Sequence, residues 1–410
     1  MIPIELDNNY QERLDQETKK DIEITIEKQE NSYLNTQRQE QTPQFLSLIS
    51  LQVTTNAKAI AICLVLAAHV LSFRGKAEVF GLTLYRFFRL GTSAVGVFAF
   101  LSGYGLTKSV EKSGLDGFFV KRFSTVYIPF FLTATCFIAL FKDVFHSMIT
   151  FKSLLNALSL FREPLSGLDN TMWFIFYICY WYILFFIVFK IFKNKHIRVI
   201  VMILLGCAIY YFFSKPYISA DLWKLTDLHK NQSFQVPLGV FFATYEKSKF
   251  IQKYLKERKV HLPILFLHTA LVCFIFGYYI YPDPYGSKIS ARKFNLLMAS
   301  MNMLFGSGVP FIFTFFVKNA NPVMDFLGNH SYEAYLVEGV LIDRLKFAKS
   351  QPEDAILFFI IVFSCAFAFK KVHQVAIKLF VSLANVVSDR ISQTYDKLRM
   401  LFNKRTYKRI

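Results

Sequence analysis

Ten apolar stretches of roughly helical length recur along the chain, and they constrain its fold more than any other feature. Most approach the ~20 residues that a helix needs to cross about 30 Å of hydrocarbon. The sixth, "FQVPLGVFFAT", is too short to cross alone. We therefore predict an all-α, polytopic integral membrane protein with about ten transmembrane helices. The stretches lie near residues 57–73, 90–106, 125–142, 172–192, 197–213, 235–245, 262–281, 294–317, 323–342 and 353–370.

Composition supports a membrane protein over a soluble or nucleic-acid-binding one. The chain is 54% hydrophobic with 47 Phe and only 19% charged residues, too apolar for a soluble domain to keep its surface wet. The net charge of +18 would suit nucleic acid, but the basic residues stand beside the ends of the apolar stretches, as in membrane proteins. All six Cys lie inside apolar runs, so the sequence indicates neither a disulfide framework nor a metal site.

Charge and polarity divide the chain into three parts. Residues 1–50 are polar and are predicted to form a disordered cytoplasmic tail, and residues 51–370 form the membrane domain. Residues 371–410 are basic, with apolar residues at helical spacing. They are predicted to form an amphipathic helix on an anionic membrane surface, or else a partner-binding helix. Because the densest basic loops and this basic tail would lie inside, both termini are predicted to be cytoplasmic. The expected location is the plasma (inner) membrane.

The first apolar stretch carries two ionisable residues, Lys58 and His69. They are eleven residues apart, almost three helical turns, so they share one helix face about 16 Å apart. An ionisable residue inside a span is costly and is a functional candidate by default. Imidazole suits proton transfer near neutral pH, although a structural His bonded to a neighbouring helix is the alternative. His268, in a later stretch, has no companion charge at matched helical phase and is predicted to be structural.

Five stretches resemble a known family. "AKAIAICLVLAAH" (57–69) is similar to the first-helix signature of acyltransferase family 3, the bacterial integral-membrane O-acyltransferases. There a basic residue, usually Arg, precedes an essential His by eleven positions, so Lys58 takes the place of the Arg and His69 matches. The other four follow in the family's order, and the resemblance covers about residues 51–370. They are "GVFAFLSGYGL" (96–106), "FFVKRFSTVYIPFF" (118–131), "NTMWFIFYICYWYILFF" (170–186) and "FLGNHSYEAYLVEGVLI" (326–342).

The chain also departs from the family pattern at two places. The family's Arg-x-x-Arg before the third helix keeps only Arg122, because Thr125 occupies the place of the second Arg. In the ninth stretch Glu338 replaces a frequent His. Other groups then supply those functions, or the substrate differs.

The resemblance implies an acyltransferase that uses acyl-CoA, usually acetyl-CoA, as its donor substrate and holds no permanent cofactor. The implied acceptor is a hydroxyl of a cell-envelope or exported polysaccharide, or of its lipid-linked precursor, and membrane lipid is the other partner. Lys58 and Arg122, at the inner ends of their helices, are expected to face the CoA phosphates. A succinyl-transferring relative, a secondary transporter and a catalytically silent scaffold or receptor remain alternatives. A transporter would show discontinuous helices in two related halves, which the sequence does not reveal.

Four residues are expected to serve the transfer itself. His69 would act as general base or carry the acyl group. Ser102 and Tyr104, in a Gly-rich stretch, would donate hydrogen bonds to the oxyanion, although Ser102 also fits simple small-residue packing. Glu338 would orient His69 or pair with a cation, because a lone buried carboxylate is expensive.

Overall fold

The computed structural model describes residues 47–72, 78–79, 82–83, 89–140, 172–214, 226–275, 288–316, 320–344 and 352–407. Two compact units are separated at Leu46, and the second unit, Ser47–Ile410, contains all of these residues. Almost all of the predicted N-terminal tail, residues 1–50, therefore lies outside the described residues.

The second unit is built from helices, apart from one antiparallel pair of two-residue strands in which Glu78 faces Thr83. The elements are α2 (Leu51–Ser72), β1 (Glu78–Val79), β2 (Leu82–Thr83), α4 (Arg89–Ser113), α5 (Phe118–Arg122), the π-helical turn η1 (Phe123–Tyr127), α6 (Ile128–Leu140), α9 (Trp173–Ile191), α10 (Lys195–Phe213), α12 (Thr226–Asn231), α13 (Gln235–Tyr245), α14 (Lys249–Lys256), α15 (His261–Ile275), α16 (Lys288–Phe316), α17 (Pro322–Asn329), α18 (Ser331–Arg344) and α19 (Pro352–Tyr407).

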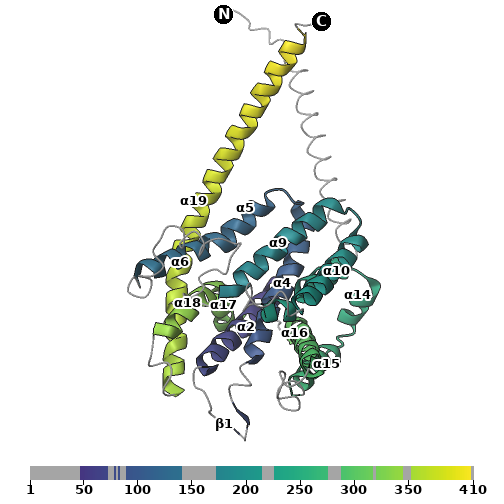
Figure 1. The fold of residues 1–410 in the computed structure, drawn as a ribbon, viewed down its shortest axis with the longest axis vertical. Coiled ribbons are helices and arrows are strands. Elements are labelled where there is room, and N and C mark those ends of the chain that lie inside the picture. The colour runs from purple at the N-terminus through teal and green to yellow at the C-terminus, as the bar shows by residue number, and fades with distance from the viewer. Residues whose placement is uncertain are drawn as a thin grey trace, which may run out of the picture. The chain divides into compact units, whose positions relative to one another are not determined.

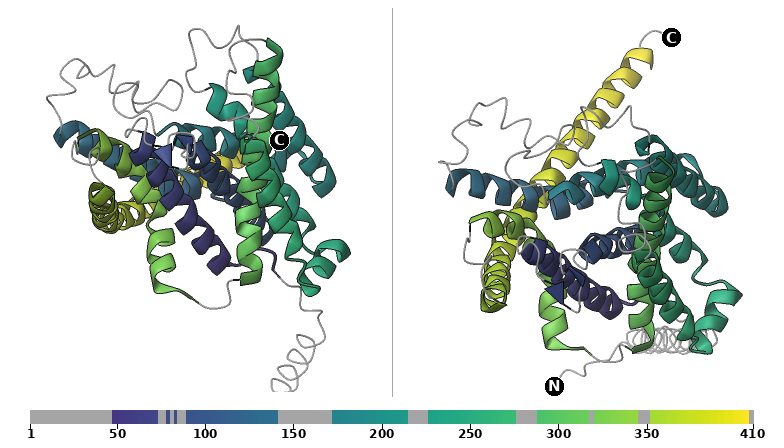
Figure 2. Two further views of the ribbon diagram at one scale, coloured as in Figure 1. Left: turned by 90° about the horizontal axis from the view of Figure 1, so that it is seen from below. Right: turned by 60° about the horizontal axis from the view of Figure 1, so that its bottom comes forward.

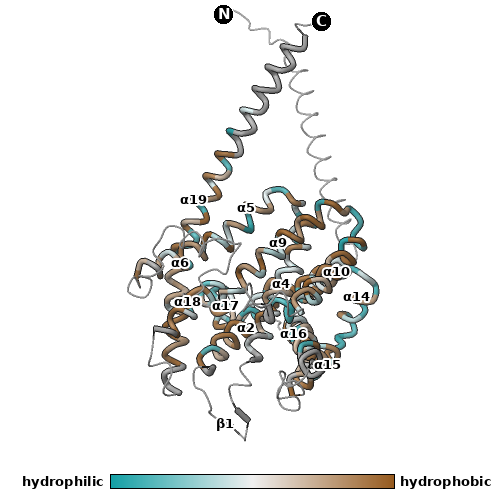
Figure 3. Tube along the Cα trace, in the orientation of Figure 1, coloured by the Kyte–Doolittle hydropathy of each residue, from teal (hydrophilic) through white to brown (hydrophobic). Residues whose placement is uncertain are grey.

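Helix covers nearly all of the described residues of the ten predicted apolar stretches, so the all-α expectation is confirmed for the described part of the chain. The ninth stretch, 323–342, is however divided between α17 and α18 at His330. Apolar residues run along most of these helices (Figure 3). That all ten cross the membrane remains a prediction. Among the residues that the structure describes, the helical stretches long and apolar enough to cross by themselves are Leu51–Val70, Trp173–Ile191, Lys195–Phe213, Asn295–Phe316 and Ile356–Val387.

Helix α4 lies at the centre of the bundle, packed against α2, α13 and α16 (Figures 1 and 2). Glycine permits this close approach. A Cβ at Gly239 of α13 would lie 2.2 Å from the Phe100 carbonyl oxygen of α4, and one at Gly91 of α4 would lie 2.2 Å from the Ala68 Cβ of α2. Small residues replace large ones where membrane helices touch, because contact between backbones drives their association. The Gly-rich part of α4 is therefore a packing surface.

The sixth predicted stretch belongs to an interrupted helix, which the sequence analysis did not anticipate. Helix α13 matches the predicted range 235–245, but the six-residue α12 precedes it and the turn 232–234 separates the two. The seven residues "HKNQSFQ", His229 to Gln235, contain this interruption. We name them the polar break.

Helix α19 runs for 56 residues without interruption. At 1.5 Å per residue it is about 84 Å long, and it extends well beyond the other helices of its unit (Figure 1). It joins the last predicted span to the predicted C-terminal tail with no helix break at residue 370. Its apolar side chains Val375, Leu379 and Leu383 are exposed, as an amphipathic helix requires. Where this face binds remains a prediction.

Candidate active site

Helix α2 presents Lys58 and His69 as the spacing predicts, because both lie within its regular span from Leu51 to Ser72. Helix α18 lies beside it and runs in the same direction, since Gly328, just before α18, packs against Thr55 while Glu338 reaches His69. A Cβ at Gly328 would stand 2.1 Å from the Thr55 carbonyl oxygen. This contact holds the end of α17, immediately before α18, against α2.

The central polar contact of the site joins His69 to Glu338. The His69 Nδ1 lies 2.7 Å from the Glu338 Oε1. The Glu338 side chain is fully buried, whereas the His69 side chain is 32% exposed. A buried carboxylate at this distance holds the ring in one orientation and accepts the Nδ1 hydrogen. The expectation that Glu338 orients His69 therefore agrees with this geometry.

A cavity of about 390 Å³ runs along α2 toward this pair. Lys58 and Val65 line it from α2, and Tyr335 lines it from α18. Val65 and Tyr335 line the far end of the cavity. His69 follows Val65 by one helical turn, and Glu338 follows Tyr335 by about one turn, so the pair lies just beyond that end. The cavity thus connects the neighbourhood of Lys58 with that of His69.

Cationic groups mark the other end of the cavity. Lys58 and Arg122 both line it. Within the described residues Lys58 has no ion pair; the charge of Lys370 repels it, and that of Glu333 attracts it without direct contact. The buried Arg122 Nε has no hydrogen-bond partner in the same part of the chain. Both cations are therefore available to an anion.

The position of the family's second Arg also lies at this end. Thr125 lines the cavity, and its hydroxyl donates to the Lys121 carbonyl of its own helix at 2.8 Å. Thr in place of the family's second Arg therefore hydrogen-bonds within its own helix and adds no charge to the cavity. In this part of the cavity wall, the described cations are Lys58 and Arg122.

Ser102 and Tyr104 lie near the Lys58 end and not beside His69. Helices α2 and α4 are antiparallel, and Gly91 contacts Ala68 next to His69. Ser102 and Tyr104 follow Gly91 by eleven and thirteen residues, which places them about 16–20 Å further along α4. Ser102 hydrogen-bonds with Tyr182, which also lines the cavity. The structure therefore does not bring the two expected oxyanion donors to the histidine.

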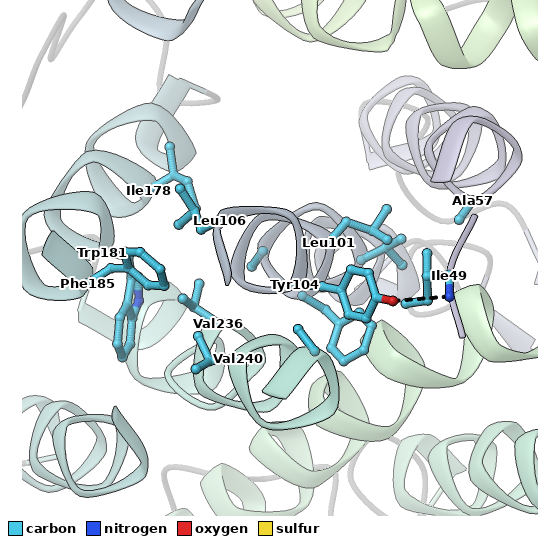
Figure 4. Close-up of a cluster of buried hydrophobic side chains, with 14 of the residues drawn as sticks. Ile49, Ala57, Leu101, Tyr104, Leu106, Ile178, Trp181, Phe185, Val236 and Val240 are labelled. Atoms are coloured by element: carbon cyan, nitrogen blue, oxygen red, sulfur yellow. Dashed lines mark hydrogen bonds between the residues drawn. The ribbon is translucent and has the colours of Figure 1, made fainter. Parts of the chain in front are cut away.

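Tyr104 lines the cavity, but its hydroxyl is held by residues that do not; Figure 4 shows its hydrogen bond with Ile49. The hydroxyl donates to the Glu246 Oε1 at 2.7 Å and accepts from the Ile49 backbone N–H at 3.4 Å. The same carboxylate oxygen accepts from the Leu48 N–H at 2.6 Å, and Lys108 binds the second oxygen at 2.7 Å. Burial would raise the pKa of Glu246, but these hydrogen bonds, led by that from Lys108, hold it below its usual value. Tyr104 thus anchors the start of α2.

Two polar groups were missed by the sequence analysis. The polar break is almost entirely buried, as are Ser93 and Asn302 beside it. His373, assigned to the C-terminal tail, is 1% exposed, with its Nε2 3.2 Å from the Thr133 hydroxyl. The signal for the first was the polar run before a short apolar stretch. No sequence signal pointed to the second, because the partner of His373 comes from a distant helix.

Comparison with known protein families agrees with this geometry. The family model described as "Acyltransferase domain", of acyltransferase family 3, matches residues 55–370, more than half of the chain. The chain belongs to acyltransferase family 3. Its predicted relationship is confirmed, and it is a membrane acyltransferase in the general sense. Comparisons with curated proteins and with solved structures found no match.

The acyltransferase shows no metal-binding arrangement in its described part. There, no group of three His, Cys, Asp or Glu side chains lies close enough together to hold an ion. His268 is exposed on α15, and its structural role remains a prediction. The ionisable residues of the site are thus Lys58 and Arg122 at one end of the cavity and the His69–Glu338 pair at the other.

Proposed function

We propose that the protein transfers an acyl group, most simply acetyl, from acyl-CoA to a hydroxyl of a cell-envelope or exported polysaccharide or its lipid-linked precursor. One observation carries this proposal. The cavity leads from two available cations to Val65 and Tyr335, about one helical turn short of a histidine held by a buried carboxylate. A donor with an anionic head and a long thin arm that ends in a reactive carbonyl fits this arrangement.

Lys58 and Arg122 bind the CoA phosphates in this proposal. Arg presents several donors in a planar fork, and Lys supplies a compact charge, so both suit phosphate oxygens. From Lys58 to His69 the path along α2 is about 16 Å. The pantetheine arm would lie in the cavity along this path and bring the thioester to the His69 end.

His69 acts as the general base. Because its Nδ1 hydrogen points to Glu338, the Nε2 carries the lone pair that accepts the proton of the acceptor hydroxyl. The hydroxyl oxygen then bonds to the acyl carbon and the carbon–sulfur bond breaks. The CoA sulfur leaves with the proton that His69 returns to it. In a variant of this scheme, His69 carries the acyl group itself between donor and acceptor.

Tyr104 does not serve as an oxyanion donor in this proposal, because its hydroxyl is already hydrogen-bonded to Glu246 and to the Ile49 backbone. Ser102, bonded to Tyr182, is better placed to contact the donor than the oxyanion. Acetyl is favoured over succinyl, because the two cations of the cavity wall lie at the Lys58 end, about 16 Å along α2 from where the extra carboxylate of a succinyl group would lie.

The protein would work in the plasma membrane with both termini in the cytoplasm, so that Lys58 and Arg122 face cytoplasmic acyl-CoA. A topology reporter fused after Ile410 should report the cytoplasm, and one inserted at Asp283 should report the outside. A cytoplasmic signal at Asp283 would mean that the interrupted helix α12–α13 does not complete a crossing.

Envelope glycan analysis tests the function. Polysaccharide from a deletion strain and from its parent is compared by proton NMR, before and after mild alkali. The deletion should remove O-acyl signals, and the parent gene should restore them where the His69→Gln variant does not. Unchanged O-acylation in the deletion strain would reject the proposal, and the scaffold or transporter alternatives would replace it.

A further inference from the structure

The polar break lies in the bundle core, where an interrupted helix needs an explanation. Helix α12 ends at Asn231 and α13 begins at Gln235, and the capping residue of α13, Phe234, provides no side-chain hydrogen bond. A break between helices is tolerated at membrane depth only where other groups, water or a ligand satisfy the freed backbone. Gln232, Ser233 and Gln235 are all 0% exposed.

Neighbouring helices satisfy part of the break. The Tyr177 hydroxyl of α9 donates to the Gln232 carbonyl, and the Asn302 amide of α16 donates to the Asn231 carbonyl at 3.2 Å. The Ser93 hydroxyl of α4 donates to the Asn302 Oδ1 at 2.5 Å. Three surrounding helices thus contribute a polar side chain to this point.

Side chains of the break itself are left unsatisfied. Within the described residues neither the Oε1 nor the Nε2 of Gln235 has a hydrogen-bond partner, and the Ser233 hydroxyl has none. The Gln235 side chain lies in a notch between two glycines, because a Cβ at Gly96 or at Gly306 would stand 3.3 Å from its Cγ. A fully buried amide with both ends unpaired indicates a polar ligand.

The type of ligand can be inferred from these groups. The Gln235 amide offers a donor and an acceptor side by side, and the Ser233 hydroxyl can serve as either. A hydroxyl group, which is also donor and acceptor, matches them. Aromatic rings also lie beside the polar break: the ring centroids of Trp173 and Tyr177 are 5.7 Å and 5.5 Å from that of His229. Amides, hydroxyls and aromatic faces together suit a sugar.

The polar break is also adjacent to the cavity between Lys58 and His69. Trp173 and Tyr177 contact the break, whereas Phe174 and Ile178 of the same helix line the cavity. The start of α9 is therefore a shared wall between the two. A glycan acceptor is long enough to place one sugar at the break and another near His69.

We propose that the polar break, through Gln235 and Ser233, binds hydroxyls of a non-reacting sugar of the acceptor. This rests on the proposed function. Ordered water can make the same hydrogen bonds, so the experiment must distinguish a bound sugar from bound water. Binding energy from a remote sugar would hold the reacting hydroxyl at His69.

The test uses the purified full chain and a Gln235→Met variant, in which an apolar side chain of similar size replaces the amide. The acceptor probe is envelope polysaccharide from the parent strain, de-O-acylated in mild alkali, and the donor is radiolabelled acetyl-CoA. The variant should raise the KM for polysaccharide about tenfold and leave the KM for acetyl-CoA unchanged. The matched control is Ser307→Ala. Its buried hydroxyl bonds only within α16, so both constants should keep their parent values.

A second measurement does not depend on acyl transfer. The polysaccharide should raise the melting temperature of the parent and of Ser307→Ala in detergent, but not that of Gln235→Met. An unchanged polysaccharide KM with a retained melting shift in Gln235→Met would show that the break holds only water, and would overturn the inference. So would a parent whose melting temperature does not respond to the polysaccharide. A parent that shows the shift without acetyl transfer would instead count against the proposed reaction alone.

Discussion

The two ends of the cavity carry one ionisable residue each from the same face of α2, yet their surroundings differ. Lys58 is half-buried and, in the described structure, has no ion pair, with Arg122 as a second cation nearby in the cavity wall. His69 contacts a fully buried carboxylate at 2.7 Å. The Lys58 end thus offers unpaired positive charge to a ligand, whereas Glu338 at the other end holds the His69 ring in one orientation.

This difference separates binding from chemistry. A cation that binds a phosphate gains from being unpaired beforehand, since no existing partner has to be displaced. A general base instead needs a defined tautomer and direction, which its partner supplies. Substitutions at the two ends should therefore change different kinetic constants.

The largest effect is expected at His69. A general base contributes about 10²–10⁴ in rate, so His69→Gln should lower the saturated rate of acetyl transfer by this range, with normal membrane insertion. Gln can remake an interhelical hydrogen bond but cannot accept and return the proton. The exposed His268→Gln serves as the control and should stay active. If His69→Gln transferred acetyl at the parental rate, His69 would not be the general base, and the assignment of binding to one end and chemistry to the other would be wrong.

Glu338→Gln should come next, with a loss of about 10–100-fold in the saturated rate, typical of a partner that orients a functional His. The substitution keeps the size and an acceptor oxygen but removes the charge. The double variant His69→Gln/Glu338→Gln should be no slower than His69→Gln alone, because the two residues act as one unit. Additive losses in steady-state assays would mean that Glu338 works elsewhere.

At the Lys58 end the change should fall on donor binding. Lys58→Ala and Arg122→Ala should each raise the acyl-CoA KM about tenfold, since a hydrogen bond to a charged group contributes about 1.5 kcal/mol. The saturated rate should change little. Lys58→Arg retains the charge and should behave like the parent. If the alanine variants keep the parental CoA dependence, the phosphates bind elsewhere.

The smallest effect concerns Glu246, which is paired near the Lys58 end but lies outside the cavity. Because its pKa in the folded protein is below the usual value, it stabilises the fold above pH ~4.5, and this is lost as pH falls through the lower folded pKa. Glu246→Gln should therefore melt a few degrees lower than the parent at pH 7, and the gap should narrow as the pH falls below about 4.5. Thermal scans in detergent check this, and a constant gap at every pH would exclude the ionic contribution.

Features that depend on local pattern could be predicted well from the sequence. The helices and the face shared by Lys58 and His69 depend on spacing within one segment, and the structure contains both. The placement of Ser102 and Tyr104 depended on how α4 runs against α2, which a single stretch does not encode. The Gly-rich motif of Tyr104 suggests catalysis, but Gly103 in that motif serves packing against Val236 of α13.

The polar break shows a second limit. Its short apolar part was recognised, but hydropathy does not show that three other helices would meet the preceding polar run. His373 is similar, since its burial depends on Thr133, 240 residues away in sequence. Contacts between distant segments decide such positions, and periodicity within one segment carries no information about them.

The π-helical turn η1 immediately follows Arg122 and has a consequence for how the site tolerates insertions and deletions. A π-turn holds one residue more than the α-helical turn it replaces, and such turns often occur at functional sites. Deleting one residue within Phe123–Tyr127 would let α5 and α6 join as one regular helix. Because the turn already absorbs that extra residue, α5 would keep nearly its present rotation relative to α6, and Arg122 would still face the cavity. The same deletion within the regular turns of α6 would rotate everything before it by about 100° relative to the rest of α6. Arg122 would then turn away from the cavity although no side chain in its wall had been substituted. Chain length is thus constrained in the regular helix and tolerated in the π-turn.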